Sequence, residues 1–149
     1  MKPPWRIVLI GVIVIGIAAM GYFLYTQYYY SYKAGKILDA TEVKGGLIVH
    51  LGCENGRLTA ALHANDRYLV HGLARDKESL ERARDHIHNL DLYGQVTVEE
   101  WDDNKLPYTD NLVNLLVAED LDGISMDEVT RVLAQIGRAS CRERVCHRV

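Results

Sequence analysis

The sequence predicts an α/β fold, a mostly parallel sheet with flanking helices, preceded by one N-terminal transmembrane helix. Residues 7–25 form a run of nineteen positions without a charged side chain. From residue 47 to residue 133, apolar runs of strand length alternate with segments of helical periodicity, which is the pattern of a parallel sheet covered by helices. A turn flanked by Gly52 and Gly56 joins the first strand to the first helix. We expect about four strands from this pattern.

The apolar segment 7–25 is long enough to cross a bilayer. As a helix it rises about 28 Å, against roughly 30 Å for the hydrocarbon core. The alternative is a cleaved signal peptide, whose apolar region is about 7–15 residues and ends at a small-x-small site that Ala18, Ala19 and Gly21 supply poorly. We therefore expect an uncleaved single-pass membrane anchor, preceded by a basic flank at residues 1–6 and followed by a tyrosine-rich juxtamembrane linker at residues 26–35.

Aromatic residues crowd the end of this segment, where amphipathic rings lie at the level of the lipid headgroups. They are Tyr22, Phe23, Tyr25, Tyr28, Tyr29, Tyr30 and Tyr32. Lys2 and Arg6 precede the segment, and Lys33 and Lys36 follow it. These nearly balanced flanks leave the topology open, and the positive-inside rule favours an amino terminus inside and a domain outside the cytoplasm.

The remaining elements follow in order from local patterns. A short helix is expected at residues 31–41, closed by Gly45 and Gly46. Residues 47–51 are a nearly continuous apolar run, typical of a strand covered on both faces, and a helix is expected at 56–64. Further strands are expected at 68–73, 96–99 and 112–118, and further helices at 76–90 and 125–133. Asp76 is placed to cap the helix at 76–90.

The end of the chain has an unusual sequence. "IGRASCRERV", residues 136–145, resembles the in-frame translation of a common short-read sequencing adapter. We expect residues 136–149 to be read-through that packs against nothing, and the globular domain, residues 36–135, to be truncated there. The alternative is a native basic tail.

Composition excludes some classes of function. Without the four arginines and one glutamate of residues 136–149, 13 basic and 19 acidic residues remain, a net charge of −6, which argues against a nucleic-acid surface. Cys141, Cys146 and His147 lack a fourth ligand and lie in the suspect segment, so no metal site is assigned. Cys53 then has no intrachain disulfide partner.

The segment "GLIVHLGCENGRLTAAL", residues 46–62, has the outline of a nucleotide site. In open α/β sheets, ligands bind beyond the carboxyl ends of the strands, where a glycine-rich turn leads into a helix. Glu54 breaks the G-x-G-x-x-G spacing of nicotinamide-binding sites, so a dehydrogenase-like nucleotide binder is disfavoured.

Several motifs together resemble the class I S-adenosylmethionine-dependent methyltransferases, a Rossmann-like family. "VHLGCENGRLTAAL" looks like the family's first motif, and "VHGLARDKESLERAR" looks like its second strand and following helix. "WDDNKLPYTDNLVNLLVAEDL" looks like its third loop and fourth strand, and "EVTRVLAQIG" resembles E-x-x-R-V-L-x-P-G-G. The resemblance implies that the family's last strands are missing here. A more distant resemblance is to bacterial membrane-anchored proteins in which a similar domain precedes a pyrroloquinoline-quinone-type β-propeller.

The resemblance also implies where S-adenosylmethionine binds. Gly52, Cys53 and Gly56 would face its methionine part, and a carboxylate at Glu54 is compatible with the cationic sulfonium and amino groups. Asp102 would accept a hydrogen bond from the adenine amino group, with Trp101 beside the ring. No catalytic residue is assigned, because methyl transfer needs mainly alignment of the reacting groups.

Three positions depart from the family pattern. His50 replaces the acid of the first motif, Glu54 replaces its middle glycine, and Ala74 stands where a carboxylate normally binds both ribose hydroxyls. Asp76 could substitute for that carboxylate, or it could simply cap its helix. We therefore expect weak binding of S-adenosylmethionine by a membrane-anchored methyltransferase-like domain, with a non-catalytic binding or scaffolding module as the alternative. The methyl acceptor and the oligomeric state are not identified by the sequence.

Overall fold

The computed structural model describes residues 5–119, 121, 123–141 and 144–147. In chain order the helices are α1 (Trp5–Thr41), α2 (Arg57–Leu62), α3 (Lys77–Asn89) and α4 (Met126–Val132). The strands are β1 (Gly46–Leu51), β2 (Tyr68–Ala74), β3 (Val96–Glu100), β4 (Val113–Ala118), β5 (Leu133–Cys141) and β6 (Arg144–His147). The predicted α/β class is confirmed, and each predicted strand and helix of the domain core lies within a few residues of its predicted position.

Within the described residues the strands form one sheet in the order β3-β2-β1-β4-β5-β6, parallel except for the antiparallel pair β5-β6. The register pairs Leu51 with Leu73 of β2 and with Ala118 of β4, and pairs Ala74 with Glu100 of β3. The carboxyl ends of β1 to β4 therefore lie along one edge of the sheet. Loops that leave this edge can form a shared site.

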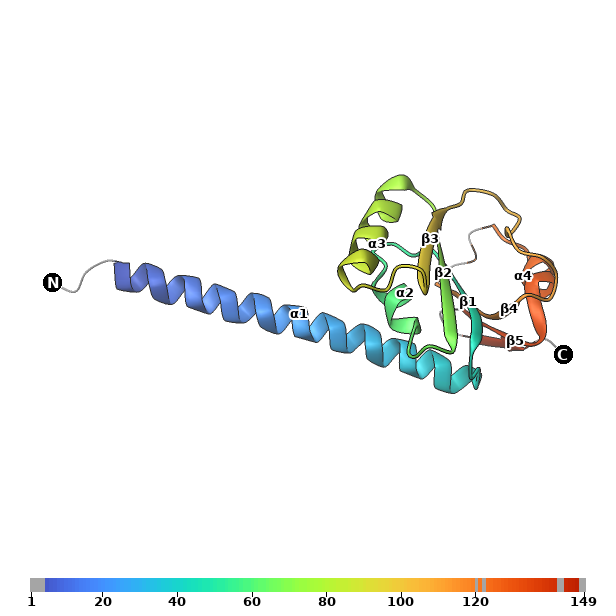
Figure 1. Cartoon of the computed structure of the whole chain (residues 1–149), viewed down its shortest axis with the longest axis horizontal. Coiled ribbons are helices and arrows are strands. Elements are labelled where there is room, and N and C mark those ends of the chain that lie inside the picture. Colours follow the sequence, from blue (N-terminus) through green and yellow to red (C-terminus); the bar gives the residue numbers. More distant parts are fainter. Residues whose placement is uncertain (1–4, 120, 122, 142–143, 148–149) are drawn as a thin grey trace.

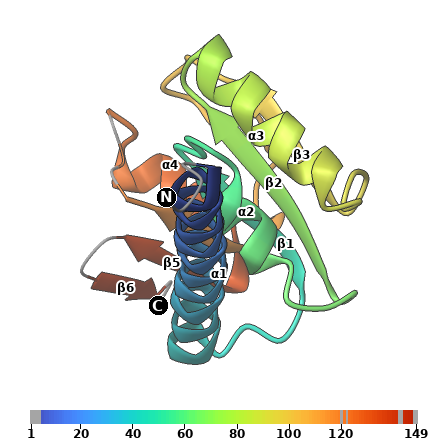
Figure 2. The same cartoon turned by 90° about the vertical axis from the view of Figure 1, so that its left-hand side faces the viewer.

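Helices cover both faces of the sheet (Figures 1 and 2). On one face, the end of α1, α2 and α3 enclose a core that includes Leu38, Leu62 and Ile87. On the other face, α4 and the loop after β3 enclose a second core that includes Val129 and Leu106. This arrangement explains why β1 and β4 are nearly continuous apolar runs, because strands covered on both faces have no solvent-facing side.

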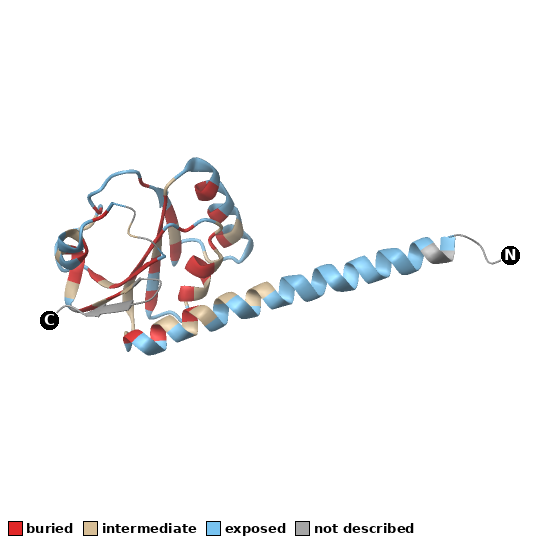
Figure 3. Ribbon diagram, turned by 180° about the vertical axis from the view of Figure 1, so that it is seen from behind, coloured by how far each residue is buried: buried red, intermediate tan, exposed pale blue. Residues whose placement is uncertain are grey.

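Helix α1 contains 37 residues and is continuous from the apolar segment into the domain. At 1.5 Å per residue it is about 56 Å long. Its last third packs on the domain, whereas its amino-terminal part extends away from it and is exposed along its length (Figures 1 and 3). The expected linker at residues 26–35 is therefore helical. No glycine or proline lies between Gly21 and Gly35 to interrupt the helix.

This helix is long and apolar enough to cross a membrane, and none of its apolar window is buried against the rest of the protein. A core helix of a soluble protein, which is mostly buried, and a signal sequence near the N-terminus can also be this long and apolar. Here the large exposed side chains include Val8, Ile15 and Leu24. A contiguous apolar surface of this kind marks a site of contact with lipid or protein.

The expectation that residues 136–149 pack against nothing is wrong for the part that the structure describes. Residues 138–141 pair with residues 115–118 of β4 in parallel, and residues 144–147 pair with β5. Ala139 is fully buried in the second core. The physical reason is that β4 presents an open row of backbone donors and acceptors, which any following segment can satisfy through its own backbone. Pairing of this kind depends little on side chains, so the adapter origin of the segment stays a prediction.

Candidate functional site

The loop between β1 and α2 lies at the carboxyl edge of the sheet. The backbone N–H groups of Gly52 and Cys53 donate to the Leu73 carbonyl of β2 at 2.9 and 3.3 Å. Gly52 and Gly56 have φ angles of 74° and 71°, the left-handed region that favours glycine. A Cβ at Gly56 would lie 2.9 Å from the backbone of Ala83 in α3, whereas a Cβ at Gly52 would meet nothing within 4 Å. Gly56 thus allows two helices to pack closely, and Gly52 leaves open space at the loop.

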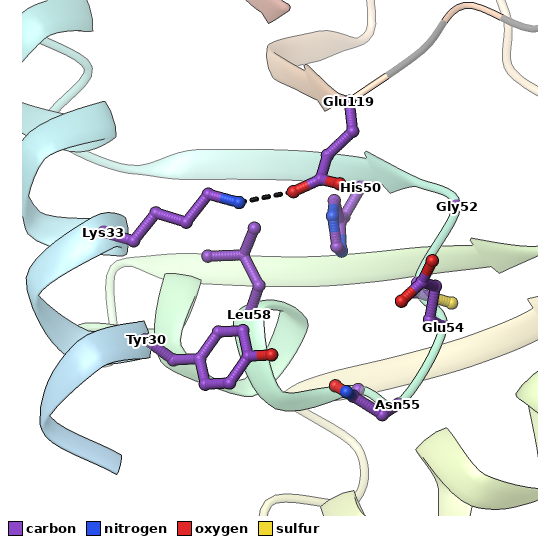
Figure 4. Close-up of a pocket in the computed structure, with 10 residues that line it drawn as sticks. Tyr30, Lys33, His50, Gly52, Glu54, Asn55, Leu58 and Glu119 are labelled. Carbon is purple, nitrogen blue, oxygen red and sulfur yellow. Dashed lines mark hydrogen bonds and ion pairs between the residues drawn. The ribbon is translucent and has the colours of Figure 1, made fainter. Parts of the chain in front are cut away.

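A small cleft lies over this loop (Figure 4). It is lined by Tyr30, Lys33, His50, Gly52, Cys53, Glu54, Asn55, Gly56, Leu58 and Glu119. Its volume is about 50 Å³. Sites that enclose small molecules usually measure roughly 300–1,000 Å³. The cleft in this conformation therefore encloses one polar group and not a whole nucleoside.

His50 lies beneath the cleft, near the end of β1, and is buried. Its Nδ1 is 2.8 Å from the Thr59 hydroxyl of α2. Burial lowers the pKa of His50 to about 4, and the nearby Glu119 carboxylate opposes this only in part. The imidazole is therefore neutral near pH 7. The position at which the family's first motif has an acidic residue thus carries no charge in this protein.

The two loop residues after Gly52 differ in their environment. Cys53 is buried. Its sulfur packs so closely on Gly72 of β2 that a Cβ added at Gly72 would lie only 3.0 Å from it. Burial raises the pKa of the Cys53 thiol to about 12, so it packs as a neutral thiol and is not a nucleophile. Glu54 is exposed and its side chain lines the cleft (Figure 4). Asn55 accepts a hydrogen bond from the Arg57 N–H at 3.1 Å and so helps to begin α2.

Helix α1 supplies one wall of the cleft, which was not predicted from the sequence. Tyr30 and Lys33 line it, and the Lys33 ammonium forms an ion pair with the Glu119 carboxylate just after β4 (Figure 4). The Arg57 guanidinium donates to the Thr26 hydroxyl at 2.8 Å, which joins α1 to the start of α2. Tyr30 was interpreted only as part of the interfacial belt. No local pattern could have indicated these contacts, because Lys33 and Glu119 are 86 positions apart.

The predicted nucleoside-binding positions lie at the ends of β2 and β3. Ala74 is fully buried and has no side-chain acceptor. Asp76 caps α3, because its carboxylate accepts from the Ser79 N–H and hydroxyl, both at 2.8 Å. These bonds lower the pKa of Asp76. The capping interpretation of Asp76 therefore accounts for both carboxylate oxygens.

The Trp101 ring is already covered on one side. The Arg75 guanidinium lies over this ring, 4.2 Å from its centroid, and the indole N–H donates to the Lys105 carbonyl at 3.0 Å. Asp102 is exposed beside it. The loop that follows is held by α4, where Arg131 donates to the carbonyls of Leu106 and Tyr108 and pairs with Glu128. Asp76, Trp101 and Asp102 therefore lie at the same sheet edge but outside the lining of the cleft.

A family model described as a methyltransferase domain matches residues 48–141. The match covers more than half of the chain and includes the loop at Gly52–Gly56. The chain belongs to this methyltransferase family. A search of curated proteins finds no match.

Solved structures share the fold of this methyltransferase domain. One is a protein from Methanococcus maripaludis assigned as an S-adenosyl-L-methionine-dependent methyltransferase, with a TM-score of 0.67 and 22% identity over 75% of this chain and 54% of that chain. The [4+2]-cyclase SpnF matches with a TM-score of 0.66 and 21% identity over 74% of this chain and 44% of that one. Geranyl diphosphate C-methyltransferase from Streptomyces coelicolor, solved with S-adenosyl-L-homocysteine, matches with a TM-score of 0.66 and 18% identity over 74% of this chain and 44% of that one.

The chain spans about half the length of these solved structures. At this level of identity they establish the Rossmann-like fold of the methyltransferase domain and not its reaction. The residues present fit S-adenosylmethionine unevenly. Gly52 leaves open space and Asp102 is exposed, whereas Ala74 offers no group to bond a ribose hydroxyl and Arg75 covers the Trp101 ring.

Proposed function

We propose that this protein is an S-adenosylmethionine-dependent methyltransferase-like domain held at a membrane surface by a single span in α1. The Gly52–Gly56 loop carries the proposal. Its open space at Gly52 and its position at the carboxyl edge of a parallel sheet support a cofactor site there. The exposed apolar part of α1 supports the anchor. In this proposal Gly52, Cys53, Glu54 and Gly56 face the methionine part of the cofactor.

A second candidate is a non-catalytic binding or scaffolding module that keeps the fold. Ala74 favours it, because losing a carboxylate that accepts two hydrogen bonds removes about 1.5–3 kcal/mol for each bond. The stacking of Arg75 on Trp101 favours it as well, because a bound adenine would have to displace the guanidinium or share the ring with it. Topology points the same way, since an amino terminus inside places the domain outside the cytoplasm, where the cofactor is not expected.

Titration of S-adenosylmethionine by calorimetry separates the candidates. The full-length protein in detergent is compared with Ala74→Asp and with Ala74→Asn, which has the same size but no charge. We expect weak binding by the unchanged protein and binding tighter by about a hundredfold to ten-thousandfold in Ala74→Asp, since two restored bonds sum to about 3–6 kcal/mol. Low-micromolar binding by the unchanged protein would reject the non-catalytic candidate. Absence of binding in all three folded proteins would reject the cofactor site.

A further inference from the structure

The loop between β3 and β4, residues 101–112, contains the two residues that the family resemblance places beside the adenine, Trp101 and Asp102. The loop crosses from the end of β3 to α4 (Figure 1). On the α4 side, the Arg131 guanidinium donates to the Tyr108 carbonyl at 2.9 Å. The bonds that fix Tyr108 therefore help to place the two predicted cofactor residues.

The Tyr108 side chain is bonded to the sheet by His71 of β2. Its hydroxyl is 2.8 Å from the His71 Nδ1, and the two rings meet edge to face with their centroids 5.7 Å apart. Burial raises the pKa of the Tyr108 hydroxyl, so this group keeps its proton. The hydroxyl can therefore donate to Nδ1 of a neutral imidazole.

The other ring nitrogen of His71 lies beside a carboxylate. Nε2 is buried and has no hydrogen-bond partner among the described residues. The Glu99 carboxylate of β3 is 3.8 Å from it, too far for a hydrogen bond but close enough to favour a proton on Nε2. The geometry therefore assigns the Nε2–H tautomer, which leaves Nδ1 as the acceptor for Tyr108.

A second proton on His71 would oppose this arrangement. It would enter at Nδ1, where the Tyr108 hydroxyl donates, so the hydroxyl would have to turn and accept instead. Burial lowers the pKa of His71, and the Glu99 carboxylate opposes this only in part. If the loop opened to water, the imidazole would regain a pKa near 6.5. Acid therefore favours the open loop, because the open form binds the proton more tightly.

The bonds on the α4 side respond to a lower range of pH. Arg131 pairs with Glu128 and with Asp110, and its bonds lower the pKa of Glu128 to about 2. The Arg131–Glu128 pair therefore keeps its charges while His71 titrates. The residues beside His71 in the register of β1 and β3 are uncharged, and Glu99 is the charged group that acts on its imidazole.

We propose that His71 is a positioning residue for the nucleoside side of the cofactor site: neutral His71 holds the loop 101–112 closed through Tyr108, and protonated His71 releases it. Where it concerns the cofactor, this inference rests on the proposed function. The closing of the loop is a property of the protein alone and is measured without cofactor.

Hydrogen exchange of the full-length protein in detergent, followed by mass spectrometry, measures the opening of the loop. The exchange rates of peptides that cover residues 101–112 are divided by the intrinsic rate at each pH, which gives the opening equilibrium. We expect opening to rise as the pH falls from about 7 to about 5, by at most tenfold for each pH unit, because one proton is taken up. Peptides from α3 report on the rest of the domain and should rise less.

His71→Gln is the decisive variant. Its amide oxygen can accept from the Tyr108 hydroxyl but does not titrate, so the loop should stay closed near pH 7 and should no longer open further in acid. Tyr108→Phe removes the bond, and opening near pH 7 should rise about twofold to tenfold. His88→Gln is the matched control, because His88 is exposed on α3.

Loop opening that is independent of pH in the unchanged protein would overturn the proposal. So would an equal rise in His71→Gln, an equal loss of the rise in His88→Gln, or a nitrogen NMR spectrum that places the neutral His71 proton on Nδ1. Absence of S-adenosylmethionine binding would reject the cofactor site of the proposed function and would leave the closing of the loop by His71 intact. The two failures are therefore distinguishable.

Discussion

Replacing Gly56 by alanine tests whether close packing of α2 on α3 holds the loop in place. Gly56→Ala places a Cβ in the left-handed region, which costs about 1–2 kcal/mol. The same Cβ would lie 2.9 Å from both the Cα and the carbonyl oxygen of Ala83, and backbone atoms cannot rotate away. Such overpacking costs about 1–3 kcal/mol more. We therefore expect Gly56→Ala to destabilise the domain by about 2–5 kcal/mol.

Gly52→Ala is the matched control. The φ angle of Gly52, 74°, is nearly the same as the 71° of Gly56, but a Cβ at Gly52 would meet nothing within 4 Å. It should lose only the conformational part, about 1–2 kcal/mol. A difference near 2 kcal/mol between the variants corresponds to roughly 8–16 °C in Tm for a domain of about 100 residues.

The assay is thermal unfolding of the full-length protein in detergent, followed by tryptophan fluorescence, since Trp101 is buried in the domain. Unfolding in urea gives the corresponding free energies. If Gly52→Ala melts as low as Gly56→Ala, then contact with α3 is not the reason for glycine at position 56.

Three further predictions concern buried or paired ionisable groups. The pKa of Glu128 is lowered to about 2 by its bonds with Arg131, so stability should fall as the pH drops from about 4.5 toward 2, and Glu128→Gln should flatten this fall in urea titrations. If stability fell as steeply with pH in Glu128→Gln, the ion pair with Arg131 would not be the cause of the fall. The pKa of His50 is lowered to about 4 by burial, so the unfolded chain takes up a proton first and stability should fall as the pH drops from about 6.5 toward 4. His50→Gln should remove that dependence, whereas an imidazole NMR titration near pH 6.5 would refute the burial argument. The pKa of Cys53 is raised to about 12 by burial, so iodoacetamide should modify it at pH 8 only after unfolding, as seen by peptide mapping; rapid modification of the folded protein would contradict this.

Local patterns determined most of the fold before any contact was known. The apolar run at residues 47–51 and the helical spacing after Asp76 predicted β1 and α3, because the period of the apolar positions follows from which face is buried. The alternation of strands and helices predicted a parallel sheet, and with it the shared edge at which β1 to β4 end. The turn flanked by Gly52 and Gly56 was likewise visible in the sequence, and the family resemblance implied the missing carboxylate at Ala74.

The tertiary structure decided what the local patterns could not. Lys33 meets Glu119 only because α1 continues without a break into the domain and packs on α2 beside the cleft. Residues 136–141 form a strand because β4 offers unpaired backbone groups, which is a property of the sheet and not of their own side chains. The sequence also left two roles open for Asp76; its bonds to Ser79 confirm the helix cap, and its role in cofactor binding stays a prediction. In each case the outcome depends on a neighbour distant in sequence or on backbone geometry, and neither leaves a periodic signal in the chain.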